Sequence, residues 1–69
     1  MKSFLLSFDL PREMNPVRLR VFRILKKINA EKVHDSLWKS SDLEALIQIA
    51  LLIKRAKGKA RILEEKFVF

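Results

Sequence analysis

The sequence contains no cysteine, only one glycine and only one histidine. The absence of cysteine excludes disulfides, thiolate zinc sites and thiol nucleophiles. A single histidine, His34, cannot form a histidine-based metal cluster. A chain of 69 residues is one small domain, residues 1–69, with a marginal core. Since covalent and metal cross-links are excluded, the remaining way to add stability is association with another subunit.

Long hydrophobic runs and acidic residues are also scarce. The longest apolar stretch, residues 47–53, contains Gln48 and is too short to span a bilayer. The apolar run at the N-terminus is too short for a signal peptide, so we expect a soluble, cytoplasmic protein. Fifteen lysines and arginines against eight acidic residues give a net charge of +7. This excess predicts a polyanionic partner, with RNA or DNA as the first candidate and an anionic membrane surface as the second.

Residue periodicity predicts three extended segments and two helices. Apolar residues alternate with other residues over 3–10, which is typical of a strand packed on one side. Asn15-Pro16 predicts a helix start, and Asn29 can end that helix in a left-handed conformation. Ser41 and Glu44 have the spacing of a capping box, and the second helix is expected to reach Lys57, with Gly58 as its C-cap.

The remaining segments complete a mixed pattern. Residues 33–38 form an extended segment, either one strand or two very short ones, in which His34 and Asp35 point to opposite faces. Residues 59–64 form a strand, and residues 66–69 can add a short final one. This order predicts an α+β, ferredoxin-like two-layer sandwich, βαβ(β)αβ, with both helices on one face of the sheet.

The second helix suggests self-association. Its polar positions in the middle are only Glu44, Gln48 and Arg55, so apolar residues cover most of its circumference. Either it is buried between the other helix and the sheet, or a second copy covers part of it. We favour the second possibility and expect a homodimer, the commonest oligomer.

Two groups of residues are candidates for function. The first helix carries a basic stripe of Arg20, Arg23, Lys26 and Lys27, preceded by Arg12 in the connecting loop, without acidic residues to pair with. The other candidate is Asp9, at the end of the first strand. A single carboxylate binds Mg²⁺ poorly, but a two-fold axis beside the strand end would bring two copies of Asp9 together.

Three segments resemble the CRISPR-associated protein 2 family, ferredoxin-like nucleases that also form the central dimer of spacer-acquisition complexes. They are Phe8-Asp9-Leu10-Pro11, the arginine-rich residues 17–25 and Val33-His34-Asp35-Ser36-Leu37-Trp38. The resemblance implies a homodimer in which two copies of Asp9 hold Mg²⁺ and activate water against a phosphodiester of RNA or DNA. It further implies that Ser36 matches the serine of the second strand segment, that the helix arginines contact the sugar-phosphate backbone, and that an integrase is a partner.

Other functions remain open at this point. A member of the family can keep only the structural, nucleic-acid-binding role, with Asp9 inert. Ferredoxin-like toxins that cleave RNA, of the virulence-associated protein D kind, share an aspartate at the strand end. A small regulatory module that pairs with another protein through the apolar second helix is the third possibility.

Overall fold

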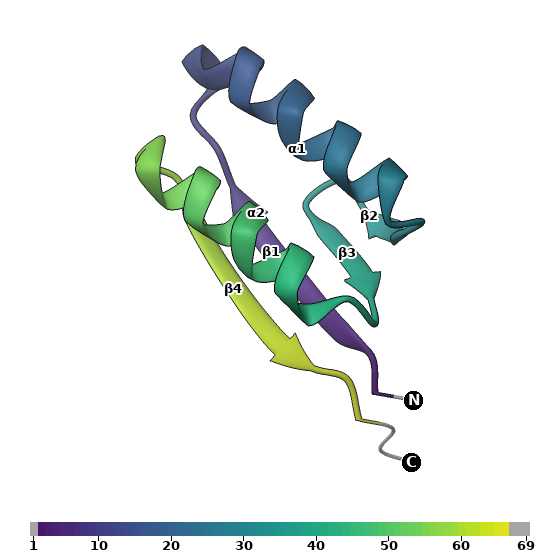
Figure 1. The fold of residues 1–69 in the computed structure, drawn as a ribbon. Coiled ribbons are helices and arrows are strands. Elements are labelled where there is room, and N and C mark those ends of the chain that lie inside the picture. Colours follow the sequence, from purple (N-terminus) through teal and green to yellow (C-terminus); the bar gives the residue numbers. More distant parts are fainter. Residues whose placement is uncertain (1, 67–69) are drawn as a thin grey trace.

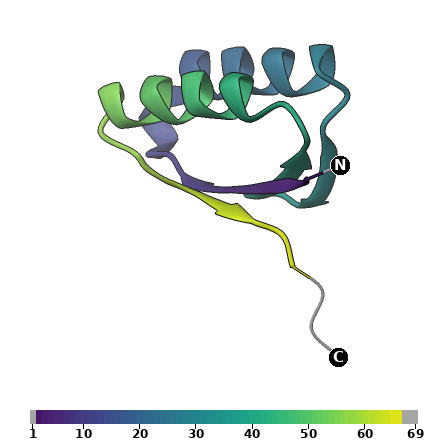
Figure 2. The ribbon, with the colours of Figure 1, turned by 60° about the horizontal axis from the view of Figure 1, so that its bottom comes forward.

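The computed structural model describes residues 2–66 as an α+β fold of two layers, a four-stranded antiparallel sheet and a pair of helices (Figure 1). In chain order the elements are β1 (Phe4–Asp9), the 3-10 turn η1 (Arg12–Met14), α1 (Asn15–Lys27), β2 (Glu31–His34), β3 (Leu37–Ser40), α2 (Leu43–Arg55) and β4 (Lys59–Glu64). Both helices lie side by side on one face of the sheet, as Figure 2 shows. The other face, which no helix of the described residues covers, is called the helix-free face below.

The strands lie in the order β2-β3-β1-β4, and each neighbouring pair is antiparallel. Helix α1 connects β1 to β2, with β3 between them, and α2 connects β3 to β4, with β1 between them. The ladder between β1 and β4 runs without interruption from Phe4 opposite Glu64 to Asp9 opposite Lys59. This topology confirms the predicted α+β class and is compatible with the ferredoxin-like arrangement.

The segment after α1 is a hairpin of two short strands rather than one strand. Asp35 and Ser36 form the turn between β2 and β3, and the register shifts between Lys32 and His34. The prediction that His34 and Asp35 lie adjacent on one strand is therefore wrong. Of the two possibilities that the sequence left open, the structure has the two very short strands.

The alternation of β1 separates the two faces of the sheet as predicted. Leu6, Phe8 and Leu10 are buried beneath the helices, whereas Ser7 and Asp9 are exposed. The buried side chains of the helices complete a single core: Val21 and Leu25 from α1, and Leu46, Ile49 and Ile53 from α2, with Trp38 and Ala56 beside them.

The sequence predicted the residue that follows the end of α1 correctly but not the residue that caps its start. Asn15 has helical dihedral angles, φ −55° and ψ −41°, so it is the first helical residue and not an N-cap. The 3-10 turn η1 leads directly into the helix and replaces the loop that was expected around Arg12. At the other end, Asn29 has a φ of 55°, which confirms its predicted left-handed conformation.

The caps of α2 are shifted from the predicted residues. Asp42, not Ser41, is the N-cap, and its side chain accepts a hydrogen bond from the Ala45 amide at 3.1 Å. The helix ends at Arg55, and the residue in the left-handed conformation is Lys57, with a φ of 63°. The predicted glycine C-cap is thus wrong in detail, because Gly58 does not have a positive φ.

Gly58 is required for a different reason. A Cβ atom at this position would lie 2.6 Å from the backbone oxygen of Asp9 and 2.8 Å from the Cγ2 atom of Ile53. The glycine therefore lets the chain leaving α2 pass close to the end of β1. Its amide also donates to the Ile53 carbonyl at 2.9 Å.

The last predicted element lies mostly beyond the described residues. Lys66 belongs to no strand, and residues 67–69 of the expected final strand are outside the range 2–66. Within that range, no helix combines the length and apolar character needed to cross a bilayer.

Candidate nucleic-acid interface

Asp9 is the last residue of β1, and its side chain is exposed on the helix-free face. It lines an open hollow of about 590 Å³ together with Ser7, Gly58 and three basic side chains, Lys54, Lys59 and Arg61. We call this feature the Asp9 hollow. Lys59 is the direct cross-strand partner of Asp9, and Arg61 is opposite Ser7. One carboxylate therefore lies among three cations, and the local field is positive.

Ser36 is brought to the same end of the sheet as Asp9. It lies in the turn of the hairpin, where its backbone oxygen accepts a hydrogen bond from the Phe8 amide at 3.0 Å. Because Phe8 directly precedes Asp9, the Ser36 turn lies beside the end of β1 that carries Asp9. Ser36 lies on the β3 side of β1, and Lys59 lies on the β4 side.

The residues around Asp9 in one chain do not fit Mg²⁺. This ion prefers several oxygen ligands in octahedral geometry, including one or two carboxylates. Among residues 2–66, Asp9 is the only carboxylate that lines the hollow, and the three cations beside it oppose a divalent cation. Nowhere in residues 2–66 do three or more histidine, cysteine, aspartate or glutamate side chains gather into a metal-binding group. A metal site at Asp9 thus depends on ligands from a second copy.

Helix α1 presents a continuous basic surface. Arg20, Arg23, Lys26 and Lys27 are all exposed on the side that faces away from the core, and α1 contains no acidic residue. We call these four residues the α1 ridge. The ion pairs found among residues 2–66 join Lys2 to Glu64, Lys32 to Asp35, and Lys39 to Glu31 and Glu65. None of them involves the ridge, so its charges repel one another without local compensation.

Arg12 and Arg18 lie outside the ridge. Arg12 is exposed in η1, before the helix starts. Arg18 is half-buried and donates through a guanidinium nitrogen to the Leu10 carbonyl at 3.2 Å, so it fastens α1 to the end of β1. Of the residues predicted to bind nucleic acid, four lie together on α1, namely Arg20, Arg23, Lys26 and Lys27. Arg12 lies apart from them in η1.

The basic residues near the C-terminus are divided between two surfaces. Lys54, Lys59 and Arg61 face the Asp9 hollow. Arg55 instead lines a groove between the two helices, opposite Arg20. The sequence did not predict that Lys54, Lys59 and Arg61 lie around Asp9. The signals that could have separated them are the 100° step between Lys54 and Arg55 on a helix and the two-residue spacing of Lys59 and Arg61 on a strand.

The β2–β3 hairpin carries two basic residues, Lys32 and Lys39, that were not among the predicted nucleic-acid-binding residues. The Nζ atom of Lys32 lies 2.9 Å from an Asp35 carboxylate oxygen. This hydrogen bond and the lysine charge, with a smaller contribution from His34, lower the pKa of Asp35 below its ordinary value. On the helix-free face, Glu31 and Glu65 similarly raise the pKa of Lys39. Lys32 and Lys39 are therefore partly neutralised, unlike the α1 ridge.

The exposed apolar residues of α2 and the Asp9 carboxylate belong to different layers of the fold. Leu46, Ile49 and Ile53 point into the core, whereas Ile47 and Leu51 remain exposed in the helical layer. Asp9 belongs to the helix-free face. The exposed apolar residues of α2 therefore do not by themselves predict a contact between two copies of Asp9.

Comparison with known proteins adds no family to this description. No protein-family model matches the chain. No curated protein matches it either.

Proposed function

We propose that this protein binds nucleic acid through phosphate contacts made by the α1 ridge. The observation that carries the proposal is the charge pattern of α1, which has five basic residues, no acidic residue and four exposed cations on one side. The ridge spans residues 20–27, about 10 Å along the helix axis, which is the length of about three phosphate intervals on one strand. A polyanion relieves the repulsion within the ridge, and this is what favours nucleic acid over a neutral partner.

The salt dependence of binding tests the proposal. Each phosphate contact contributes a slope of about −0.7 to −0.9 to the logarithm of the binding constant against the logarithm of salt concentration. We expect the double variant Arg20→Ala/Lys27→Ala to bind labelled RNA and DNA more weakly and to reduce the slope by roughly 1.4 to 1.8. Fluorescence anisotropy over a series of salt concentrations measures both quantities.

The matched control removes the same charge from the helix-free face. The double variant Lys59→Ala/Arg61→Ala alters exposed residues of β4 and should leave the slope much closer to that of the unaltered protein. Equal losses in the two double variants would contradict an interface on the α1 ridge. Salt-sensitive binding to anionic vesicles, without such binding to RNA or DNA, would contradict nucleic acid as the partner.

The second candidate function is a Mg²⁺-dependent phosphodiesterase of the kind found in the CRISPR-associated protein 2 family, acting in spacer acquisition with an integrase partner. The observation that favours it is the exposure of Asp9 at a strand end on the helix-free face, with the Ser36 turn beside β1. This function requires a homodimer whose two-fold axis passes through the helix-free face. Mg²⁺ held by two copies of Asp9 would then supply an activated water, the chemistry that one chain lacks.

A cross-linking experiment tests that geometry directly. Because the chain has no cysteine, Asp9→Cys and Leu51→Cys each introduce the only thiol of the protein. A short bis-maleimide should link Asp9→Cys chains if the dimer forms through the helix-free face, and Leu51→Cys chains if it forms through α2. Linkage at Leu51 alone, or metal-dependent cleavage that survives Asp9→Asn, would exclude the proposed Asp9 centre.

A further inference from the structure

A second hollow, of about 420 Å³, lies between α1 and the β2–β3 hairpin. Its apolar lining comes from Leu19, Phe22 and Trp38, and its basic residues are Arg23, Lys26 and Lys32. We call it the aromatic slot. Two of the basic residues, Arg23 and Lys26, also belong to the α1 ridge, so the slot opens directly beside the surface that contacts phosphate in the proposed function.

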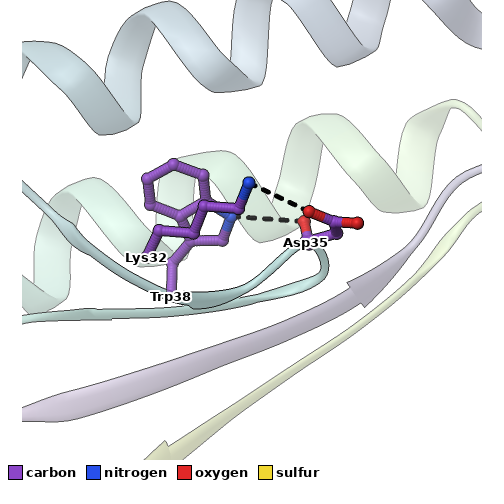
Figure 3. A network of polar contacts seen from close by, with 3 residues as sticks. All are labelled: Lys32, Asp35 and Trp38. Atoms are coloured by element: carbon purple, nitrogen blue, oxygen red, sulfur yellow. Dashed lines mark hydrogen bonds and ion pairs between the residues drawn. The ribbon is translucent and has the colours of Figure 1, made fainter.

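The aromatic walls of the slot are held in place. The ring centroids of Phe22 and Trp38 are 6.0 Å apart and the rings are tilted by 40°, within the range of favourable aromatic pairs. The Trp38 indole nitrogen donates to the Asp35 backbone oxygen at 3.4 Å, and the same residue binds Lys32 through its carboxylate (Figure 3). The turn of the hairpin thus orients the Trp38 ring, and the exposed Asp35 carboxylate lies beside the Lys32 charge.

The outer edge of the slot is uncovered apolar surface. Leu19 is 57% exposed, although its neighbours in the slot are aromatic. Exposed leucines are common, but one that adjoins an aromatic hollow with a cationic rim offers a favourable place for a planar apolar group. The basic residues around the slot favour a planar group that carries negative charge. Asp35 compensates Lys32, which leaves Arg23 and Lys26 to attract an anion.

We propose that the aromatic slot accepts an unpaired nucleobase, and that the protein accordingly prefers single-stranded nucleic acid to duplex. The inference rests on the proposed nucleic-acid function and specifies its substrate class. A base supplies the planar face that fits Leu19 and Phe22, and its flanking phosphates supply the negative charge that fits Arg23 and Lys26. Inorganic phosphate leaves the apolar lining unused, and an uncharged apolar group leaves the cations unused. The bases of a duplex are stacked and paired, so they cannot enter the slot.

The protein contains its own reporter for this interaction. Trp38 is the only tryptophan, and the chain has no tyrosine, so the intrinsic emission comes from the slot. The ligands are a thymidine oligonucleotide of about 12 nucleotides, within the usual span of about 4–16 for small single-strand binders, an abasic strand of the same length, and a duplex of that length. We expect the thymidine strand to change Trp38 emission and to bind roughly 5- to 150-fold more tightly than the abasic strand, the effect of one stacked base.

Two matched variants locate the effect. Leu19→Glu places a carboxylate at the slot, whereas Ile47→Glu places one on α2 outside both the slot and the groove beside Arg20, at a position that is 45% exposed. We expect Leu19→Glu to abolish the preference for the thymidine strand over the abasic strand and Ile47→Glu to preserve it. Circular dichroism of both variants checks that each one is folded.

The outcomes separate the slot from the proposed function. Equal affinity for the thymidine and abasic strands, with salt-sensitive binding and unchanged Trp38 emission, overturns the slot while nucleic-acid binding stands. Duplex that binds as tightly as the thymidine strand and changes the emission equally also overturns it. Absence of salt-sensitive binding to all three ligands overturns the proposed function and the slot together.

Discussion

The close approach of Gly58 to β1 leads to a quantitative prediction for Gly58→Ala. The added methyl group would lie 2.6 Å from the Asp9 backbone oxygen and 2.8 Å from the Ile53 Cγ2 atom, both below a normal contact distance. Neither neighbour is the free end of a flexible side chain: one is backbone of a strand that is paired on both sides, and the other belongs to a fully buried residue. The substitution must therefore move the end of α2 away from β1.

The expected size of this effect combines two opposing terms. Overpacking of a rigid site costs about 1–3 kcal/mol. The φ of Gly58 is not positive, so alanine can adopt the backbone conformation and lowers the entropy of the unfolded chain, a gain of about 0.4–1 kcal/mol. The balance is a destabilisation of roughly 1–2 kcal/mol, or a fall in Tm of about 4–16 °C for a domain of this size.

Thermal and urea unfolding of Gly58→Ala measure this difference, with Lys57→Gly as the control. Lys57 has a φ of 63°, so glycine removes a left-handed strain of about 1–2 kcal/mol and adds a similar entropy to the unfolded state. We expect this control to change stability by less than about 1 kcal/mol. If Gly58→Ala is as stable as the unaltered protein, the steric argument is refuted, and with it the contact that positions the backbone of Asp9.

Two further predictions concern exposed polar residues. Asp42→Ala should destabilise the protein by about 0.5–2 kcal/mol in urea unfolding, because its side chain caps α2, while Ser41→Ala should have much less effect; the opposite order would restore Ser41 as the cap. The pKa of Asp35 is lowered chiefly by Lys32, so this carboxylate adds stability at neutral pH that is lost as the pH falls through its lowered pKa. A carbon-13 NMR titration should show Lys32→Met raising the Asp35 pKa and Lys27→Met leaving it nearly unchanged, and an unshifted pKa in Lys32→Met would contradict the ion pair.

The parts of the fold that follow from periodicity could be predicted from the sequence. The alternation of Leu6 and Phe8 with Ser7 and Asp9 is strong because one side of β1 is covered by helices and the other is not. Asn29 was predictable because few residues other than glycine adopt a left-handed conformation readily, and asparagine is one of them.

The hairpin and the C-terminal end of α2 could not be predicted in the same way. The turn at Asp35 and Ser36 contains no glycine or proline, so it lacks the usual signals of a tight hairpin. Gly58 did indicate that α2 ends nearby, but the glycine is required by a tertiary contact. Its backbone passes close to the backbone of Asp9, which is distant in sequence. A single glycine therefore indicated the correct place for the helix to end and the wrong physical reason.

The candidate site was predictable where its residues lie within one helix and not where they come from several elements. The α1 ridge follows from helical spacing within one element, so the sequence identified Arg20, Arg23, Lys26 and Lys27 together. The Asp9 hollow joins β1, the end of α2 and β4, and its basic residues come from elements that only the sheet order brings together. The aromatic slot also depends on the packing of α1 against the hairpin.

The places of α2 and Asp9 in the fold change the kind of dimer that would bring two copies of Asp9 together. In the sequence, the apolar α2 implied a dimer, and the dimer supplied a second carboxylate. In the structure, Ile47 and Leu51 are exposed in the helical layer and Asp9 on the helix-free face, so the first observation does not by itself support the second. A dimer that pairs two Asp9 side chains must cover part of the helix-free face, where Leu5, Leu37 and Leu63 are partly or fully exposed.

Charge then decides which ligand such a dimer would favour. Two Asp9 hollows facing each other would combine two carboxylates with six cations from Lys54, Lys59 and Arg61 of both copies. A divalent cation between the carboxylates would experience that net positive surrounding, and the energy of each unfavourable pair falls only as the inverse of distance. Removing cations from the hollow should therefore strengthen metal binding by such a dimer. Calorimetric titration of Mg²⁺ into the unaltered protein and into Lys59→Ala/Arg61→Ala measures this effect, and we expect tighter binding in the double variant. Equal Mg²⁺ affinity in both titrations would show that the cations of the hollow do not control the Asp9 pair.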